Sequence, residues 1–83
     1  MYNLNMHEAI DAALEGKWVQ GENFASGVIM TCGVSGYGVN IDTGSVISTY
    51  NFKTGLVSPM IFSKNTNLQK FRIIETQQEA MKK

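Results

Sequence analysis

A stripe of apolar positions near the N-terminus predicts a helix over residues 6–15. Its members recur every three or four residues, which places them on one helical face: Met6, Ala9, Ile10, Ala13 and Leu14. Asn5 can cap the first turn, and Glu8 completes the spacing of a capping box with it. Gly16 stands where a left-handed residue ends many helices. The pattern therefore predicts both the helix and its limits.

Beyond Gly16 the spacing of apolar residues changes to that of β-strands. Five short runs rich in β-branched or aromatic residues alternate with turn residues: 17–20, 28–32, 37–41, 46–52 and 71–74. Asp42-Thr43-Gly44 is expected to join the third and fourth runs as a hairpin, with Gly44 left-handed. Pro59 interrupts the apolar residues 56–62, which favours an edge strand or a loop there.

These elements predict an α+β fold, in which one N-terminal helix packs on a small antiparallel meander of about five strands. The short turns between strands leave no room for helical crossovers, so a parallel sheet is excluded. The 83 residues are enough for one small core, and we expect a single domain over residues 1–75. Residues 76–83 lack a core pattern and are expected to be a polar C-terminal tail, either frayed or forming a short helix.

The composition is that of a globular protein, with 43% hydrophobic residues, 17% charged residues and no net charge. Residues 1–42 carry five acidic residues against one lysine (−4), and residues 43–83 carry six basic residues against two acidic ones (+4). So few basic side chains argue against binding to duplex nucleic acid, but they suffice for one small anionic ligand or for docking between subunits. No apolar run is long enough for a membrane span, and neither the N-terminus nor the single cysteine indicates secretion, so we expect a cytoplasmic protein.

Residues suited to catalysis or metal binding are scarce. His7 is the only histidine and lies in the first turn of the expected helix, so a Ser–His–Asp arrangement lacks a positioned base. His7 and Cys32 do not have the spacing of metal ligands. The glycine-rich residues 33–38 are not followed by Lys-Ser/Thr, so a hairpin bend is a better interpretation than a phosphate loop. We therefore expect a binding protein rather than an enzyme, with no catalytic residue, metal or cofactor.

Aromatic side chains are the remaining candidates for ligand binding. Most of the eight should fill the core or an interface. Phe24 and Tyr37 lie beside turns among polar neighbours, where an aromatic face can stack on a base. The aromatic surplus and the small size of the chain also favour a homo-oligomer, either a dimer or a tetramer.

Two segments resemble a known family of phage proteins. The first has the spacing Met6-x-Glu8-Ala9-Ile10-x-Ala12-x-x-x-Gly16-Lys17-x-Val19, followed five residues later by the aromatic Phe24. The second and weaker match is the closing stretch Leu68-Gln69-Lys70-Phe71-Arg72-Ile73-Ile74. Together they cover about 30 residues and resemble the second type of Thoeris anti-defence sponges, which open with an amphipathic helix, a Gly-Lys-x-Val strand and a Gly-Trp turn.

The resemblance implies an α+β subunit of a homotetramer that sequesters a nucleotide immune signal without cleaving it. The signal would be a cyclic ADP-ribose isomer, made by a bacterial TIR enzyme, or a cyclic oligonucleotide, and the site of action would be the cytoplasm of the host bacterium. Departures from the family leave the identity of the ligand open: Phe24 replaces a ligand-contacting tryptophan, Asn23 a glycine, Gly21 a frequent arginine, and Lys70-Phe71 an Asp-Trp pair. Because the same fold family is also associated with anti-CRISPR activity, the alternative is a small phage accessory protein that inhibits a host protein by direct contact.

The candidate ligand site combines two polar segments of the chain. Phe24 is expected to stack on a base, with Asn23 and Ser26 of the same turn as hydrogen-bond partners. Contacts to a phosphate or a ribose are expected from the polar stretch before the closing strand: Lys64, Asn65 and Thr66. One subunit offers few such contacts, so we expect the pocket at a subunit interface. The alternative is that Phe24 fills the core and that Lys64 is solvated.

Overall fold

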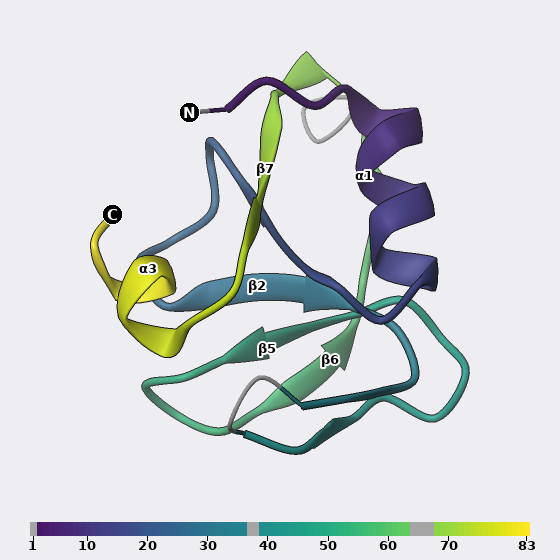
Figure 1. Cartoon of the computed structure of the whole chain (residues 1–83), viewed down its shortest axis with the longest axis vertical. Helices are drawn as coiled ribbons and strands as arrows, with labels where there is room; N and C mark the ends of the chain where they lie inside the picture. The colour runs from purple at the N-terminus through teal and green to yellow at the C-terminus, as the bar shows by residue number, and fades with distance from the viewer. Residues whose placement is uncertain (1, 37–38, 64–67) are drawn as a thin grey trace.

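The structure is a computed structural model of the chain, and it describes residues 2–36, 39–63 and 68–83. The helices and strands of this part are α1 (Met6–Leu14), β1 (Trp18–Gly21), β2 (Val28–Thr31), β3 (Val34–Ser35), β4 (Ile41–Asp42), β5 (Ser48–Asn51), β6 (Val57–Pro59), β7 (Phe71–Ile74) and α3 (Gln77–Met81). Figure 1 shows the two helices α1 and α3 on opposite sides of β7.

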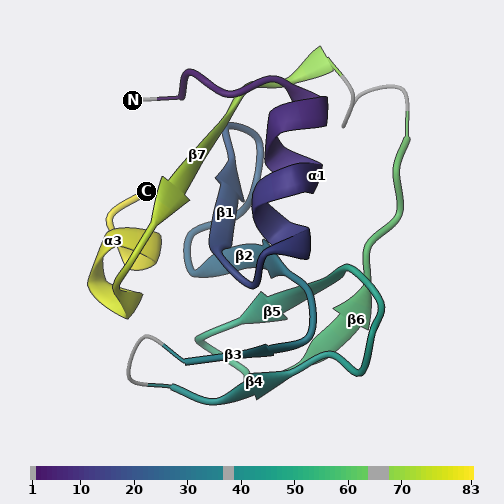
Figure 2. The ribbon, with the colours of Figure 1, turned by 45° about the vertical axis from the view of Figure 1, so that its right-hand side comes forward.

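Five strands form one antiparallel sheet in the order β6-β5-β2-β1-β7, and β3 and β4 form a separate hairpin. The two most extensive ladders pair β1 with β7 and β2 with β5, through four residue pairs each. α1 packs against β1, β2 and β7 in the middle and at one end of the sheet (Figure 2). The predicted α+β fold, with an N-terminal helix on a five-stranded antiparallel sheet, is confirmed.

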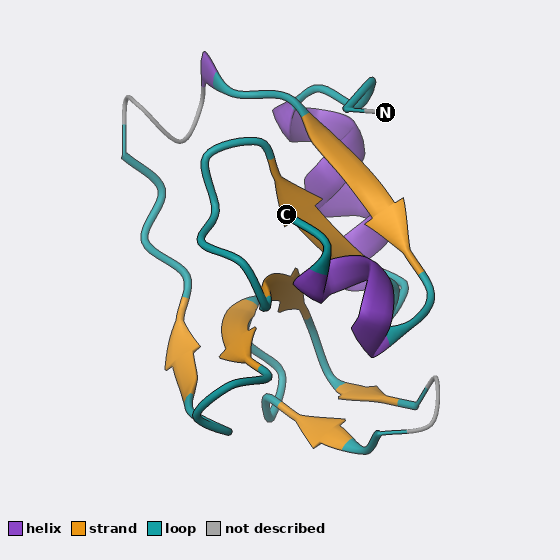
Figure 3. Ribbon diagram, turned by 90° about the vertical axis from the view of Figure 1, so that its left-hand side faces the viewer, coloured by secondary structure: helices purple, strands orange, loops and turns teal. Residues whose placement is uncertain are grey.

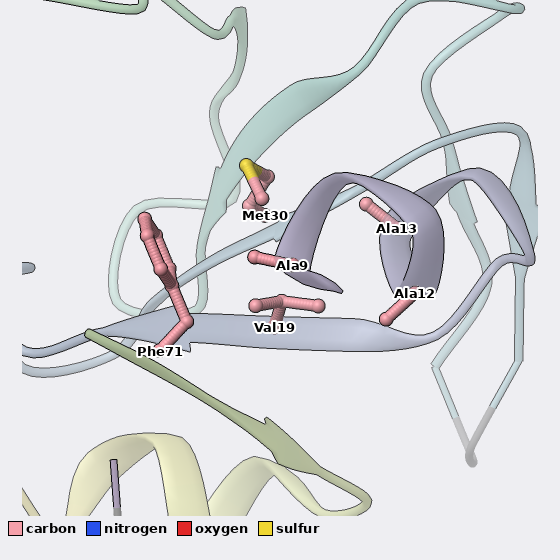
Figure 4. Close-up of a cluster of buried hydrophobic side chains, with 6 residues drawn as sticks. All are labelled: Ala9, Ala12, Ala13, Val19, Met30 and Phe71. Carbon is pink, nitrogen blue, oxygen red and sulfur yellow. The ribbon is translucent and has the colours of Figure 1, made fainter. Parts of the chain in front are cut away.

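Each face of the sheet carries its own apolar cluster, because successive residues of a strand point to opposite sides. The buried residues on the α1 side, drawn in Figure 4, are Ala9, Ala12, Ala13, Val19, Met30 and Phe71. Those of the second cluster are Trp18, Ile29, Ile41, Ile74 and Ala80. The second cluster includes one residue from β4 and one from α3, so these elements cover the face opposite α1.

Helix α1 begins at Met6 as the sequence predicts and ends at Leu14, one residue before the predicted end. The Asn5 side chain accepts a hydrogen bond from the Glu8 amide at 2.9 Å, and the Glu8 carboxylate accepts one from the Asn5 amide at 3.0 Å. This reciprocal pair is the capping box expected from the spacing. Gly16 follows the helix with a φ of +87°, the left-handed conformation that glycine adopts without strain.

The buried face of α1 differs from the predicted stripe. It is centred on Ala9, Ala12 and Ala13, whereas Ile10 is half-buried and Leu14 is 59% exposed. Alanine side chains are small, so the helix can lie close to the strands beneath it. The larger residues of the stripe consequently lie at the margin of the contact instead of at its centre.

This packing predicts that Ala13→Leu destabilises the protein, although leucine is the more hydrophobic residue. The substitution inserts a larger side chain between α1 and the sheet at a position with no exposed surface, and should lower the free energy of unfolding by about 1–3 kcal/mol. Ile10→Ala removes a half-buried side chain and should cost less than the roughly 2–5 kcal/mol of a buried isoleucine. Urea unfolding followed by Trp18 fluorescence measures both, and a cost of 2–5 kcal/mol for Ile10→Ala beside a neutral Ala13→Leu would contradict the packing.

The C-terminal residues form helix α3, which is the second of the two forms expected for the tail. The Thr76 side chain caps it by accepting a hydrogen bond from the Glu79 amide at 3.1 Å. Ala80 has no exposed surface and lies in the cluster with Trp18. The Gln20 side chain is also buried, and its Nε2 donates to the Ala80 carbonyl at 2.9 Å. The participation of this segment in the core is a feature that its polar sequence did not predict.

The strand pairing predicted across Asp42-Thr43-Gly44 is wrong, although the turn itself is present. Gly44 has a φ of +71°, and its amide donates to the Asp42 carboxylate at 2.8 Å. However, β4 pairs back to β3, and β5 pairs with β2 of the large sheet. The glycine-rich residues 33–38, expected to form a hairpin bend, include strand β3. Of the strand expected over 37–41, Tyr37 and Gly38 lie outside the described residues.

Candidate functional site

The turn predicted to bind a ligand follows β1 directly. The Phe24 amide donates to the Gly21 carbonyl at 3.0 Å and closes the turn. Asn23 is exposed, and its backbone amide donates to the Gln69 side-chain oxygen at 2.8 Å. This bond fixes the backbone of Asn23 while its side chain stays at the surface.

Phe24 lies between the core and the surface. Its half-buried ring meets the Phe71 ring edge to face, with centroids 6.0 Å apart and an interplanar angle of 86°, and it packs against the cluster under α1. Gly21 leaves the space that this ring needs, because a Cβ atom there would lie 2.8 Å from two of its carbons. Phe24 therefore packs against the core and keeps part of its surface exposed, and its stacking on a base stays a prediction.

Two segments that are far apart in the sequence lie side by side at this turn. The Glu22 amide donates to the Lys70 carbonyl at 2.9 Å, next to the bond between Asn23 and Gln69. Gln69 is only 7% exposed, and the sequence analysis did not identify it as part of the site. The one feature of the sequence that could have indicated its contribution to the site is its position just before the closing strand. The expected residues Lys64, Asn65 and Thr66 lie outside the described residues.

The end of helix α3 holds the other side of the turn. The Ser26 hydroxyl donates to the Met81 carbonyl at 3.0 Å, and the Gly27 amide donates to the Ala80 carbonyl at 2.9 Å. The Lys83 ammonium donates to the Gly21 carbonyl at 2.7 Å and also to the carbonyl of Glu22. Residues 21–27 are thus tied to α3 at several points, so the predicted site depends on the C-terminal segment for its shape.

Arg72 and Lys83 form a basic group beside the turn, which the sequence analysis did not predict. The Arg72 guanidinium donates to the Gln20 side-chain oxygen at 2.7 and 3.2 Å and to the Glu79 carbonyl at 3.0 Å. The Tyr2 ring lies 4.9 Å from the Arg72 guanidinium carbon and 5.4 Å from the Lys83 nitrogen. Partial burial and the charge of Arg72 lower the pKa of Lys83 below its usual value, against a smaller opposing effect of Glu22. Because both cations bond to protein acceptors, they fasten the C-terminal segment to the sheet.

Two surface hollows lie beside α3. The first has a volume of about 370 Å³ and is lined by Asn3, Leu4, Arg72, Ile73 and Glu79. The second has a volume of about 620 Å³ and is lined by Gln77, Gln78, Met81 and Lys82. Neither hollow is lined by Asn23, Phe24 or Ser26, so the predicted turn lies outside both of them.

The residues considered for catalysis and metal binding lie apart from the turn. His7 is exposed on α1, and Cys32 is half-buried after β2. Within residues 2–36, 39–63 and 68–83, no group of three or more His, Cys, Asp or Glu side chains is arranged to hold a metal ion. No helix in the same ranges has both the length and the apolar character needed to cross a membrane.

Comparison with known proteins identifies no relative. No family model, no curated protein and no solved structure matches the chain. The function is therefore inferred from the residues of this chain and from the resemblance of two of its segments.

Proposed function

We propose that this protein is a phage anti-defence protein, which binds a cyclic nucleotide immune signal and sequesters it without cleaving it. The main support is the contact between the turn after β1 and the segment before β7, made by the Asn23–Gln69 and Glu22–Lys70 hydrogen bonds. The turn carries Phe24, the aromatic residue that ends the first match to the Thoeris anti-defence sponges, and Gln69 and Lys70 lie in the closing stretch that forms the second match. A single ligand site formed by both segments requires that they lie side by side.

The proposed contacts follow from the chemistry of a cyclic nucleotide, which offers flat bases and charged phosphates. The accessible part of Phe24 stacks on a base, which is worth about 1–3 kcal/mol. The exposed Asn23 side chain bonds to a base edge or a ribose. Ser26 acts as an acceptor, because its hydroxyl proton is donated to Met81. Charge-assisted contacts of about 1.5–3 kcal/mol are assigned to the stretch before β7, formed by Lys64, Asn65 and Thr66.

Tight binding needs several of these contacts to converge on one ligand. A single turn with one half-buried ring supplies few of them, so a second copy of the chain completes the site in a homo-oligomer, a dimer or a tetramer. Acting in the host bacterial cytoplasm, such an assembly removes the signal stoichiometrically before it reaches its effector. No chemical step on the ligand is needed for this effect.

Capture and release of the ligand tests the proposal. Purified protein is incubated with lysate of cells in which a TIR enzyme is active, washed, and boiled. We expect the supernatant to activate the effector and to contain an intact cyclic nucleotide by mass spectrometry, while lysate without TIR activity yields neither. Hydrolysed nucleotide in excess of the protein would contradict sequestration. Stable capture of a host protein, with no nucleotide released, would favour direct inhibition of that protein instead.

A further inference from the structure

The open edge of the sheet carries an apolar strip formed by residues 56–62, named here the β6 strip. Residues 54–63 contain no charged residue. Four large apolar side chains of the strip are exposed: Leu56 (66%), Val57 (42%), Ile61 (80%) and Phe62 (42%). In Figure 3, β6 and the chain that follows it form one margin of the molecule, with no other element beyond them. The strip is therefore a predominantly apolar surface at the periphery of the protomer.

The backbone of β6 adds unpaired polar groups to this surface. The Met60 amide donates to the Ile47 carbonyl at 3.0 Å, and the Leu56 carbonyl accepts from the Asn51 amide at 3.1 Å. Because the direction of these groups alternates along an antiparallel strand, the amide and carbonyl of Val57 point away from the sheet. Pro59 shares that outward direction, so its missing N–H removes no bond to β5. The open edge thus presents both a donor and an acceptor at Val57.

The two edge strands of the sheet, β7 and β6, differ in whether another segment of the chain bonds to their outer side. At β7 the chain covers its own edge, since Leu4 and Phe71 exchange two backbone hydrogen bonds of 2.8 and 2.9 Å. At β6 no described segment does the same, and the neighbouring Val46 side chain is also 56% exposed. Exposed sheet edges are ordinarily protected by charged side chains, by proline or by the shortness of the strand. β6 has Pro59 and only three residues, but no charged side chain is present between residues 54 and 63. The exposed apolar side chains of this edge therefore indicate a surface that is covered in the functional state.

We infer that the β6 strip is the contact surface for a second copy of this chain, arranged antiparallel about a twofold axis near Pro59, the middle residue of the strip. In that arrangement Val57 of each protomer lies opposite Ile61 of the other, where the Val57 amide donates to the Ile61 carbonyl and the Val57 carbonyl accepts from the Ile61 amide. The surface is self-complementary in charge, because an uncharged strip meets an identical one without repulsion. A partner of opposite charge would find no charged residue to pair with.

The dimensions of the strip suit an interface between protomers. Seven extended residues span about 23 Å, which is most of the 28 Å longest dimension of the protomer. Side-chain burial along this length supplies most of the stabilisation, because Pro59 at the centre has no N–H and limits the ladder to the bonds between Val57 and Ile61. A stable interface buries about 800 Å² on each partner, and the strip together with Val46 provides an apolar centre for it.

This inference rests on the proposed function, which requires a second copy of the chain to complete the ligand site. It adds the surface at which that second copy binds, the β6 strip.

Substitution of the most exposed strip residue tests this inference. Ile61→Lys introduces a charge into the interface at a side chain that is 80% exposed in the protomer, so the protomer fold should be unaffected. Val34→Lys is the matched control, because Val34 is 70% exposed on β3, outside the strip. By sedimentation equilibrium at about 100 µM, we expect the wild type and Val34→Lys to have at least twice the 9.2 kDa mass of the single chain. Ile61→Lys should weaken the association at least tenfold.

Amide hydrogen exchange provides a second and local measurement. The Val57 amide should exchange slowly in the wild type and quickly in Ile61→Lys, while the Met60 amide, bonded within the protomer, should be unchanged. A monomeric wild type, or association that Ile61→Lys leaves intact, would overturn the inference. If the wild type is a monomer that binds the nucleotide, the interface is overturned but the proposed function is not. If the wild type is a dimer that Ile61→Lys dissociates, but it binds no nucleotide, only the proposed function is contradicted.

Discussion

Replacing Ala80 with aspartate is expected to lower the free energy of unfolding by about 3–5 kcal/mol. Ala80 has no exposed surface and lies against the cluster that contains Trp18 and Ile29. A carboxylate at this position has no cation within the cluster to pair with, and burying an unpaired charge is costly. A domain of this size has a total stability of about 4–12 kcal/mol, so the substitution should remove at least about a quarter of it.

Gln78→Asp is the matched control for this prediction. It introduces the same carboxylate into the same helix at an exposed position and should change the stability by less than about 0.5 kcal/mol. Urea unfolding followed by Trp18 fluorescence measures both variants. Equal and small effects would show that α3 is not part of the core and would contradict the structure at its C-terminus.

Replacing Phe24 with leucine is expected to reduce the affinity for the cyclic nucleotide at least tenfold. Leucine keeps most of the apolar contact with the cluster under α1, but it removes the ring that stacks on a base. A base–aromatic stack is worth about 1–3 kcal/mol, and 1.4 kcal/mol corresponds to a factor of ten. Isothermal titration calorimetry with a cyclic ADP-ribose isomer measures the change.

Phe52→Leu is the control for the loss of a half-buried aromatic ring. Phe52 contacts Trp18 and Tyr50, with ring centroids 5.2 and 5.0 Å apart, in the cluster that does not include Phe24. We expect this variant to retain the affinity of the wild type at a comparable cost in stability. A tenfold loss in both variants would indicate a general effect on the fold, and no loss in Phe24→Leu would remove Phe24 from the site.

The parts of the fold that were predictable are those set by local sequence. The capping residues Asn5 and Glu8 and the left-handed Gly16 act within a few residues, so the ends of helix α1 were predicted to within one residue. Pro59 likewise marks an edge strand by its own chemistry, because it cannot donate a hydrogen bond to a neighbouring strand. Local rules of this kind determine the elements but not which strands become neighbours.

The errors concern pairing and packing between distant segments. The sequence around Gly44 specifies a turn, but the choice between pairing β4 with β3 and pairing it with β5 depends on which face each strand covers. Helix α3 has a polar sequence, and Ala80 is its only buried residue. The Gln20 side chain bonds to the Ala80 carbonyl and the Arg72 side chain to the Glu79 carbonyl, and these two bonds hold the helix against the core. The contacts of Gln20 with Ala80 and with Arg72 join residues 60 and 52 positions apart and leave no local pattern.

The candidate site was predictable in part for the same reason. The polar turn with Phe24 was recognisable from its composition, and the structure places it beside the closing segment. The contact of Gln69 with this turn was not predictable, because a glutamine before a strand is usually a surface residue. Its burial follows from the bond to the Asn23 backbone, which the sequence does not indicate. Gly21 is a similar case, since its lack of a side chain matters only when the Phe24 ring and Gln69 are packed against it.

An amide-resolved NMR titration with a cyclic ADP-ribose isomer tests the central claim most directly, because it reports binding, its location and the fate of the ligand in one sample. The account predicts saturable shifts at the amides of Asn23, Phe24 and Gln69, no shifts at Val34 or Gly44, and ligand resonances that keep the pattern of the intact ring. Shifts that avoid the turn after β1, no shifts at all, or the appearance of ring-opened product would contradict it.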